Sequence, residues 1–221
     1  MQRSVFAMIL AALALLGVGA YAVITYAPGT SSSGATVATS TISESTEGYD
    51  IDVQYPQFGI PAIDTQIKSA YDEAVSELKA QPTVMHGESA AKYSFTGRFD
   101  DVYIGPDVIS VELVLSSYTG GAHPMTLFSG VAFDRTTGKR LALADALALI
   151  GKDVAQVSAE SSTSLARQLG DMFMFKEGAD TNPENYSSFL VSRDAVTFIF
   201  QQYQVAAYAA GPQRVSFPRI P

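Results

Sequence analysis

The stretch YDIDVQYPQFGIPAIDTQIKSAYDEAVSEL, residues 49–78, decides the fold class, because its hydrophobic period changes partway along. Residues 49–55 alternate aromatic or β-branched side chains with polar ones, which predicts a half-buried strand. In the second part, apolar side chains recur every three or four residues, which predicts one stripe of a helix. They are Ile63, Ile67, Ala70, Tyr71, Ala74, Val75 and Leu78. Asp64, Lys79 and Pro82 fit the two ends of such a helix.

Strand patterns dominate the chain beyond this helix. The expected strands cover residues 91–99, 102–104, 108–118, 125–134, 195–203 and 215–217. A second helical region is expected over residues 143–169, with a break near Gly151. This order of elements predicts an α+β domain with a largely antiparallel sheet, packed by one long N-terminal helix and by the second helical region.

The chain begins with an apolar segment. Residues 4–27 are almost entirely apolar and long enough to cross a bilayer as a helix, with Arg3 on the inner flank. Ala20-Tyr21-Ala22 has the form of a signal-peptide cleavage site, so a cleaved signal is the competing interpretation. Apolarity continues past this triplet, which favours an uncleaved anchor. Both interpretations place the remainder outside the cytoplasm, as a single-pass membrane protein or as a secreted or periplasmic one.

Four segments are therefore expected. Residues 1–27 form the transmembrane anchor or signal peptide, and residues 28–48, rich in Ser, Thr and Gly, form a flexible linker. Residues 49–105 form a strand–helix–strand module, and residues 106–221 form an α+β module. The prediction is a two-part ectodomain behind one membrane or export segment.

The composition of the 221 residues narrows the possible functions. The formal net charge is −8, and the chain contains no cysteine. An acidic surface repels nucleic acid and attracts basic proteins over long range. The lack of cysteine excludes disulfides, a thiol nucleophile and cysteine-bound zinc. With His86 and His123 as the two histidines, a histidine-rich metal site is impossible. We expect no metal and no cofactor.

Familiar catalytic signatures do not occur in the sequence. It has no GxSxG, HExxH, P-loop or dinucleotide-binding glycine pattern. The carboxylate pairs Asp72/Glu73 and Asp100/Asp101 are candidates for acid–base catalysis. Adjacent side chains, however, point apart on a helix and to opposite faces of a strand. We expect these carboxylates to be solvated, and we do not expect an enzyme.

Residues 117–124, SYTGGAHP, stand out between two predicted strands. The glycine pair permits backbone angles closed to other residues, so that successive N–H groups can hold an anion beside the tyrosine and the histidine. The alternative is a constrained crossing between strands, in which the tyrosine packs and the histidine bonds to nearby backbone. The candidate ligand-binding residues here are Tyr118, Thr119, Gly120, Gly121 and His123.

A second stretch, residues 203–212, combines small residues with Tyr203 and Tyr208. Tyrosine offers a large contact area at low entropic cost, which favours a ligand-binding surface. Close packing of the small residues against the sheet is the other interpretation.

Both stretches carry a resemblance, supported by Phe133-Asp134, Thr137-Gly138-Lys139 and Leu141. Residues 49–218 resemble a bacterial extracytoplasmic domain family of unknown function. That family forms the outer region of lysozyme-binding anti-sigma factors of the RsiV type and the non-catalytic region of PdaC-type peptidoglycan deacetylases. The resemblance implies an α+β ectodomain that binds a ligand of the cell envelope, either peptidoglycan or a basic protein such as lysozyme.

We do not expect this chain to have the full activity of an anti-sigma factor or of a deacetylase. An anti-sigma factor needs a cytoplasmic segment, and Met1-Gln2-Arg3 alone precede the apolar run. A deacetylase needs a catalytic domain with metal ligands. The expectation is a membrane-tethered, non-catalytic binding module. Two alternatives stay open: a cell-wall-acting enzyme that uses His123, and a structural assembly protein of the envelope.

Overall fold

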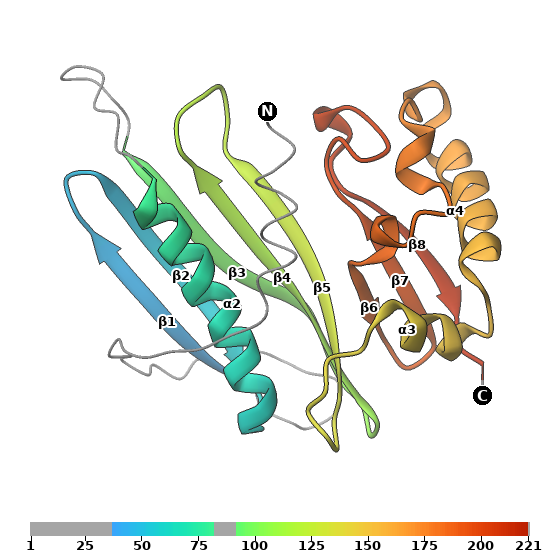
Figure 1. Cartoon of the computed structure of the whole chain (residues 1–221), viewed down its shortest axis with the longest axis horizontal. Coiled ribbons are helices and arrows are strands. Elements are labelled where there is room, and N and C mark those ends of the chain that lie inside the picture. Colours follow the sequence, from blue (N-terminus) through green and yellow to red (C-terminus); the bar gives the residue numbers. More distant parts are fainter. Residues whose placement is uncertain (1–36, 82–91, 221) are drawn as a thin grey trace. The chain divides into compact units, whose positions relative to one another are not determined.

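The computed structural model describes residues 37–81 and 92–220 (Figure 1). In this part of the chain, no helix is both long and apolar enough to cross a membrane. The expected anchor or signal over residues 1–27 lies outside the described residues, as do the first part of the expected linker and His86.

Two sheets organise the described chain (Figure 1). The five-stranded sheet has the order β1-β2-β3-β4-β5 and the three-stranded sheet the order β6-β7-β8. The strands are β1 (Ala38–Ser45), β2 (Tyr49–Gln57), β3 (Tyr93–Ile104), β4 (Val108–Tyr118), β5 (Met125–Asp134), β6 (Phe189–Val191), β7 (Ala195–Phe200) and β8 (Gln213–Pro218). A mostly antiparallel α+β arrangement confirms the expected fold class, and β4 and β5 have the predicted bounds.

Helix α2 (Pro61–Ala80) confirms the helix expected from the apolar stripe. It connects β2 to β3, which pair in parallel with Ile51 opposite Phe95. A parallel pair requires a crossover connection, and α2 supplies it by lying over these strands (Figure 1). The hydroxyl of the fully buried Tyr71 donates to the carbonyl of Arg98 at 2.9 Å, which joins the helix to the sheet.

Strand β1 corrects part of the expected linker. The Ser/Thr-rich composition predicts a flexible segment over residues 28–48, but Ala38–Ser45 pairs antiparallel with β2, with Ile42 opposite Val53. An edge strand takes its backbone hydrogen bonds from one neighbour, so it needs no regular apolar pattern of its own. The tertiary partner therefore overrides the local composition.

The chain divides into two compact units, each made of separate pieces. Of the described residues, the first unit contains 37–81, 92–99 and 115–126, and the second contains 100–114 and 127–220. The sequence predicts a single boundary between residues 105 and 106. Instead, β3, β4 and β5 are long enough to contribute residues to both units.

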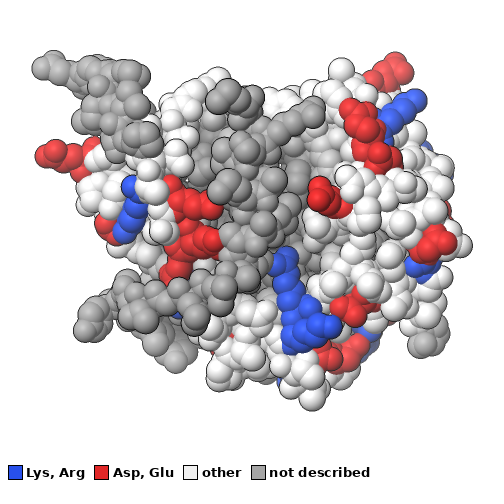
Figure 2. Space-filling view, viewed as in Figure 1, with Lys and Arg blue, Asp and Glu red and all other residues white. Residues whose placement is uncertain are grey.

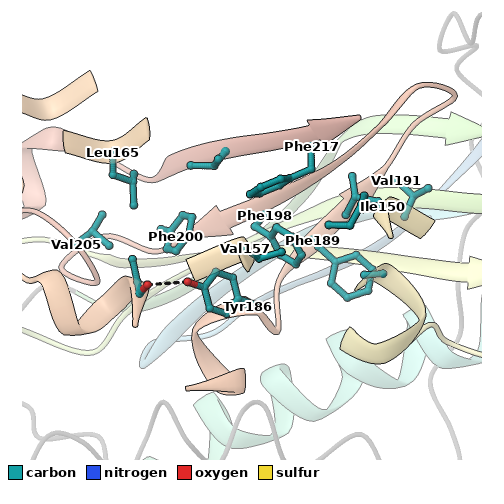
Figure 3. Packing of buried hydrophobic residues seen from close by; sticks show 14 of the residues in the cluster. Ile150, Val157, Leu165, Tyr186, Phe189, Val191, Phe198, Phe200, Val205 and Phe217 are labelled. Carbon is teal, nitrogen blue, oxygen red and sulfur yellow. Dashed lines mark hydrogen bonds between the residues drawn. The ribbon is translucent and has the colours of Figure 1, made fainter. Parts of the chain in front are cut away.

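Helices and aromatic side chains form the core of the second unit. Helices α3 (Leu143–Ile150) and α4 (Val154–Leu169) confirm the second helical region, and Gly151 breaks it at a φ of +64°. The buried ring of Tyr186 meets Phe198 and Phe200 edge-to-face, with centroids 5.4 and 5.7 Å apart (Figure 3). Short 3-10 helices complete this unit: Gly170–Met172, Lys176–Ala179, Pro183–Tyr186 and Tyr208–Ala210.

Candidate functional site

The glycine-rich loop predicted to bind a ligand connects β4 to β5 in the first unit. Gly120 and Gly121 adopt positive φ angles of +94° and +122°. A Cβ atom on either residue would meet no atom within 4 Å. The backbone conformation, and not crowding, therefore requires glycine at both positions.

Side chains of this loop bond to neighbouring backbone. The Oη atom of Tyr118 donates to the carbonyl of Gly121 at 3.2 Å. The Nδ1 atom of His123 lies 2.8 Å from the carbonyl oxygen of Pro124. Both contacts fit a constrained connection between strands, while Thr119 is exposed. Ligand binding by this loop stays a prediction.

The carboxylate pairs singled out in the sequence have local partners. Asp72 forms an ion pair with Lys68 one turn away on α2. Asp100 accepts a hydrogen bond from the backbone N–H of Asp101. Within residues 37–81 and 92–220, no group of three or more His, Asp or Glu side chains is placed to hold a metal ion.

Tyr203 and Tyr208, the other predicted pair, come together in the second unit. Their ring centroids are 5.5 Å apart, and the ring planes meet at 38°. Tyr203 is 50% exposed and has a φ of +64°, a left-handed conformation that is costly for a bulky side chain. Among the described non-glycine residues, Asp101 is the other with a positive φ, and aspartate tolerates this conformation. Strain of this kind at a surface aromatic residue points to a function.

Gln204 holds the strained tyrosine in place. Its Oε1 atom accepts from the N–H of Gln201 at 2.8 Å, and its Nε2 atom donates to the carbonyls of Gly178 and Asn185 at 2.9 and 3.0 Å. A Cβ atom at Gly178 would lie 1.8 Å from the carbonyl oxygen of Gln204, so the two segments meet backbone to backbone. These contacts fix the loop from within and leave the Tyr203 ring half exposed.

Two exposed methionines belong to the segment that is hydrogen-bonded to this loop. Met172 and Met174 are 56% and 60% exposed, whereas Phe173 between them is buried. The N–H of Met174 donates to the carbonyl of Val205 at 3.1 Å, so the methionine segment lies beside the tyrosine loop. We call the four residues the Tyr–Met surface: Met172, Met174, Tyr203 and Tyr208.

The methionines are functional candidates that the sequence does not single out. Their local signal is the alternation Met-Phe-Met-Phe over residues 172–175. Such an alternation indicates side chains that face two opposite directions, and here Phe173 is buried, Phe175 is half-buried and both methionines are exposed. The pattern does not tell which of the two faces is the buried one.

Carboxylates are frequent in the sequence around the two methionines. Segment 170–186 contains one basic residue, Lys176, and four acidic ones: Asp171, Glu177, Asp180 and Glu184. All five side chains belong to exposed residues. Figure 2 shows several clusters of acidic side chains on one face of the described residues, and the whole chain carries a net charge of −8. A positively charged partner would be attracted to such a surface.

Two family models match the chain in succession. Residues 42–126 match the model described as "Deacetylase PdaC", and residues 140–219 match that of "Protein of unknown function (DUF3298)". The first match includes the glycine-rich loop, and the second includes the Tyr–Met surface.

Curated relatives cover parts of the chain. The immunogenic protein MPT64 of Mycobacterium tuberculosis is 30% identical over 111 residues, 50% of this chain and 48% of that protein. The peptidoglycan-N-acetylmuramic acid deacetylase PdaC of Bacillus subtilis is 23% identical over 175 residues, 76% of this chain and 37% of the deacetylase. The chain thus spans about half or less of the length of these relatives.

Solved structures share the fold. A DUF3298-family protein from Bacteroides fragilis superimposes with a TM-score of 0.53 at 18% identity, over 82% of this chain and 89% of that one. A DUF3298-family protein from Pseudomonas aeruginosa gives 0.52 at 18% identity, over 82% and 90% of the two chains. The resemblance expected from the sequence is confirmed for its PdaC branch, while the likeness to anti-sigma factors stays a prediction. Two successive segments of the chain thus match the PdaC and DUF3298 models, and the chain resembles a domain of unknown function and the non-catalytic region of PdaC.

Proposed function

We propose that this protein is a non-catalytic binding module of the bacterial cell envelope, outside the cytoplasm and tethered by residues 1–27. Its Tyr–Met surface receives a basic protein such as a lysozyme. The observation that carries this proposal is Tyr203, an exposed aromatic residue kept at a φ of +64° by a hydrogen-bonded neighbour. Backbone strain is retained where it serves a function, and a partner that contacts the exposed half of the ring would supply that function.

The composition of the Tyr–Met surface favours a protein as partner. Tyrosine and methionine are enriched in protein interfaces relative to other surfaces, and methionine adapts its shape to what it contacts. The four acidic residues of segment 170–186 add an attraction for a basic partner and raise the rate of encounter. A half-exposed tyrosine pair can serve as the anchor of such an interface.

Peptidoglycan is a second candidate ligand, and the comparison with PdaC favours it. The PdaC model matches residues 42–126, and the relative of that name acts, by its name, on peptidoglycan N-acetylmuramic acid. The flat rings of Tyr203 and Tyr208 can also lie against the apolar faces of sugar rings. The salt dependence of binding separates the two ligands, because contact with an uncharged sugar face does not depend on screening.

The test uses the purified full chain with hen lysozyme and, in parallel, with insoluble peptidoglycan. Tyr203→Ala and Met174→Ser should each weaken lysozyme binding by about tenfold or more, the size expected for an anchor residue. Raising the salt from about 0.1 to 1 M, which shortens the Debye length from roughly 10 to 3 Å, should weaken it further. Met125→Ser is the matched control, because Met125 is also exposed but belongs to the first unit.

Each outcome decides between the candidates. If the chain bound peptidoglycan independently of salt, and if Tyr203→Ala abolished this binding, peptidoglycan would be the ligand. If the unchanged chain bound neither ligand, the binding function would be wrong. A Tyr118→Ala variant in the same series tests whether the glycine-rich loop contributes, as the sequence predicts.

A further inference from the structure

A cleft of about 460 Å³ opens in the second unit, away from the Tyr–Met surface in sequence. Three chain segments line it: the end of β3 with its turn to β4, the turn between β6 and β7, and the residues that follow β8. Arg193 and Asp194 stand at the start of β7, whereas Tyr203 follows its end. The six residues of β7 separate these places by about 20 Å, so the cleft is a different site.

An ion pair fixed in position forms part of the cleft lining. The Nη2 atom of Arg219 lies 2.6 Å from Oδ2 of Asp107, and its Nη1 atom donates to the carbonyl of Ser192 at 3.0 Å. The Arg219 side chain is 14% exposed. Burial alone would raise the pKa of Asp107, but the hydrogen bond from Arg219 and nearby backbone N–H groups lower it overall. This pair is neutral as a unit and shapes the site without supplying a net charge.

Two opposite charges at the rim have no such partner. Arg193 and Asp194 are neighbours in the β6–β7 turn, and both are exposed. Neither forms an ion pair with any residue in the described ranges. Two hydrogen bonds fix the turn itself. The Oγ atom of Ser192 accepts from the N–H of Ala195 at 3.1 Å and donates to the carbonyl of Ala195 at 3.2 Å. A cation and an anion are thus presented side by side on a defined turn.

The remaining lining is apolar. Ile220 is 55% exposed, which is unusual for an isoleucine in the part of the chain that the structure describes. Its N–H donates to the carbonyl of Leu149 at 3.0 Å, so the residue has a fixed place beside α3. The ring of Tyr103 lies over Gly105, where a Cβ atom would come within 2.5 Å of the tyrosine hydroxyl. Small apolar groups can therefore be covered between these side chains.

We infer that this cleft binds the carboxyl-terminal end of a short peptide with small apolar side chains. The guanidinium of Arg193 takes the terminal carboxylate, because a planar fork of N–H donors matches two carboxylate oxygens. Asp194 accepts from the peptide amine or N–H, and Ile220 and Tyr103 cover the apolar side chain. The charges of the cleft, two guanidinium groups and two carboxylates, cancel, which suits a zwitterion better than a phosphate dianion.

The test is an NMR titration of the isotopically labelled full chain with the dipeptide alanyl-alanine, in L,L and D,D forms. Saturable shifts are expected for the amides of Arg193, Asp194 and Ile220. Capping the dipeptide carboxylate as an amide, or replacing Arg193 by glutamine, should each weaken binding by about tenfold or more. Arg167→Gln, which changes an exposed arginine in the last turn of α4, should leave binding unchanged.

Several results would overturn the inference. They are equal binding of acid and amide, equal binding by the Arg193→Gln variant with an unaltered spectrum elsewhere, competition by inorganic phosphate at the same concentration, and no saturable shift. The inference does not rest on the proposed function. Tyr203→Ala should leave dipeptide binding intact, and Arg193→Gln should leave lysozyme or peptidoglycan binding intact, so each can fail alone.

Discussion

At the scale of single residues, Tyr203 departs most from what its side chain prefers. A tyrosine at a φ of +64° gives up conformational energy that a glycine would not. Four hydrogen bonds formed by the side chain and backbone of Gln204 maintain this backbone conformation. Residues kept in unfavourable backbone regions cluster where a protein binds or reacts, and the exposed ring fits that tendency.

A pair of substitutions measures this strain. Tyr203→Gly should be more stable than Tyr203→Ala by about 1 kcal/mol, because alanine keeps the left-handed penalty and glycine does not. Urea unfolding followed by circular dichroism gives both free energies. The usual order, with alanine the more stable, would show that the position is not strained.

The close approach at Gly178 gives a second prediction for a single residue. Gly178→Ala should lower the free energy of unfolding by about 2–3 kcal/mol, because the new methyl group would collide with the carbonyl oxygen of Gln204. Thermal and urea unfolding report the change. Glu177→Ala, an exposed neighbour in the same 3-10 helix, should stay within about 0.5 kcal/mol of the parent.

At the scale of elements, a buried carboxylate joins β4 to β8 in the second unit. The side chain of Glu112 is 4% exposed, and both of its oxygens accept from Nη2 of Arg214, at 2.6 and 2.7 Å. Asp101 lies 4.0 Å from the same guanidinium. A buried carboxylate is tolerated when it is paired, so Glu112 depends on the arginine.

Removing Arg214 alone should therefore lower the free energy of unfolding more than removing both Arg214 and Glu112. Arg214→Ala should lower the free energy of unfolding by about 3 kcal/mol, at the low end for buried pairs because this arginine side chain is 40% exposed. The double variant Glu112→Leu with Arg214→Leu should lose less than Arg214→Ala alone. Chemical denaturation of the variants measures this difference. A double variant that is less stable than Arg214→Ala would contradict the argument.

At the scale of the whole molecule, each unit buries a tyrosine hydroxyl that donates to a backbone carbonyl. Tyr71 in the first unit donates to the carbonyl of Arg98, and Tyr186 in the second donates to the carbonyl of Ala179 at 2.7 Å. Burial raises the pKa of both phenols above the ordinary value. Both hydroxyls therefore lose their protons at a higher pH than an exposed tyrosine does.

This burial predicts a loss of stability at alkaline pH. Tyrosines of an unfolded chain ionise at a pH of about 10, whereas these two resist ionisation in the folded state. The contribution to the free energy of unfolding is therefore fully present below about pH 10 and falls as the pH rises further. Ultraviolet titration should show two tyrosines that ionise together with loss of circular dichroism. Tyr71→Phe and Tyr186→Phe should each remove one tyrosine that ionises at high pH. If all tyrosines ionised before the protein unfolded, the predicted loss of stability would be wrong.

Local pattern accounts for the elements that were predicted correctly. The apolar stripe of residues 63–78 needs no distant partner to mark one face of a helix, and α2 follows it. Strands β4 and β5 lie between turn residues that fix their ends, and Gly151 ends α3 where its backbone turns left-handed. These signals act over a few residues, so they are readable along the chain.

Features that depend on distant partners were not predictable in this way. Strand β1 exists because β2 offers it hydrogen bonds, and β2 pairs in parallel with β3 because α2 crosses between them. Strand β6 has three residues and is defined by its pairing with β7. Short or polar strands carry too little local preference to be recognised without their neighbours.

In the candidate site, too, some features follow from the local sequence and others from the tertiary structure. By itself, the sequence determined the α+β class, the acidic charge and the presence of Tyr203 and Tyr208 in a loop built from small residues. Tertiary structure alone decided that Tyr203 is strained, that the segment of Met172 and Met174 lies beside its loop, and that Arg193 lines a cleft. Composition and period are properties of neighbouring residues, whereas strain, exposure and a cleft arise when segments far apart in the chain are packed against one another.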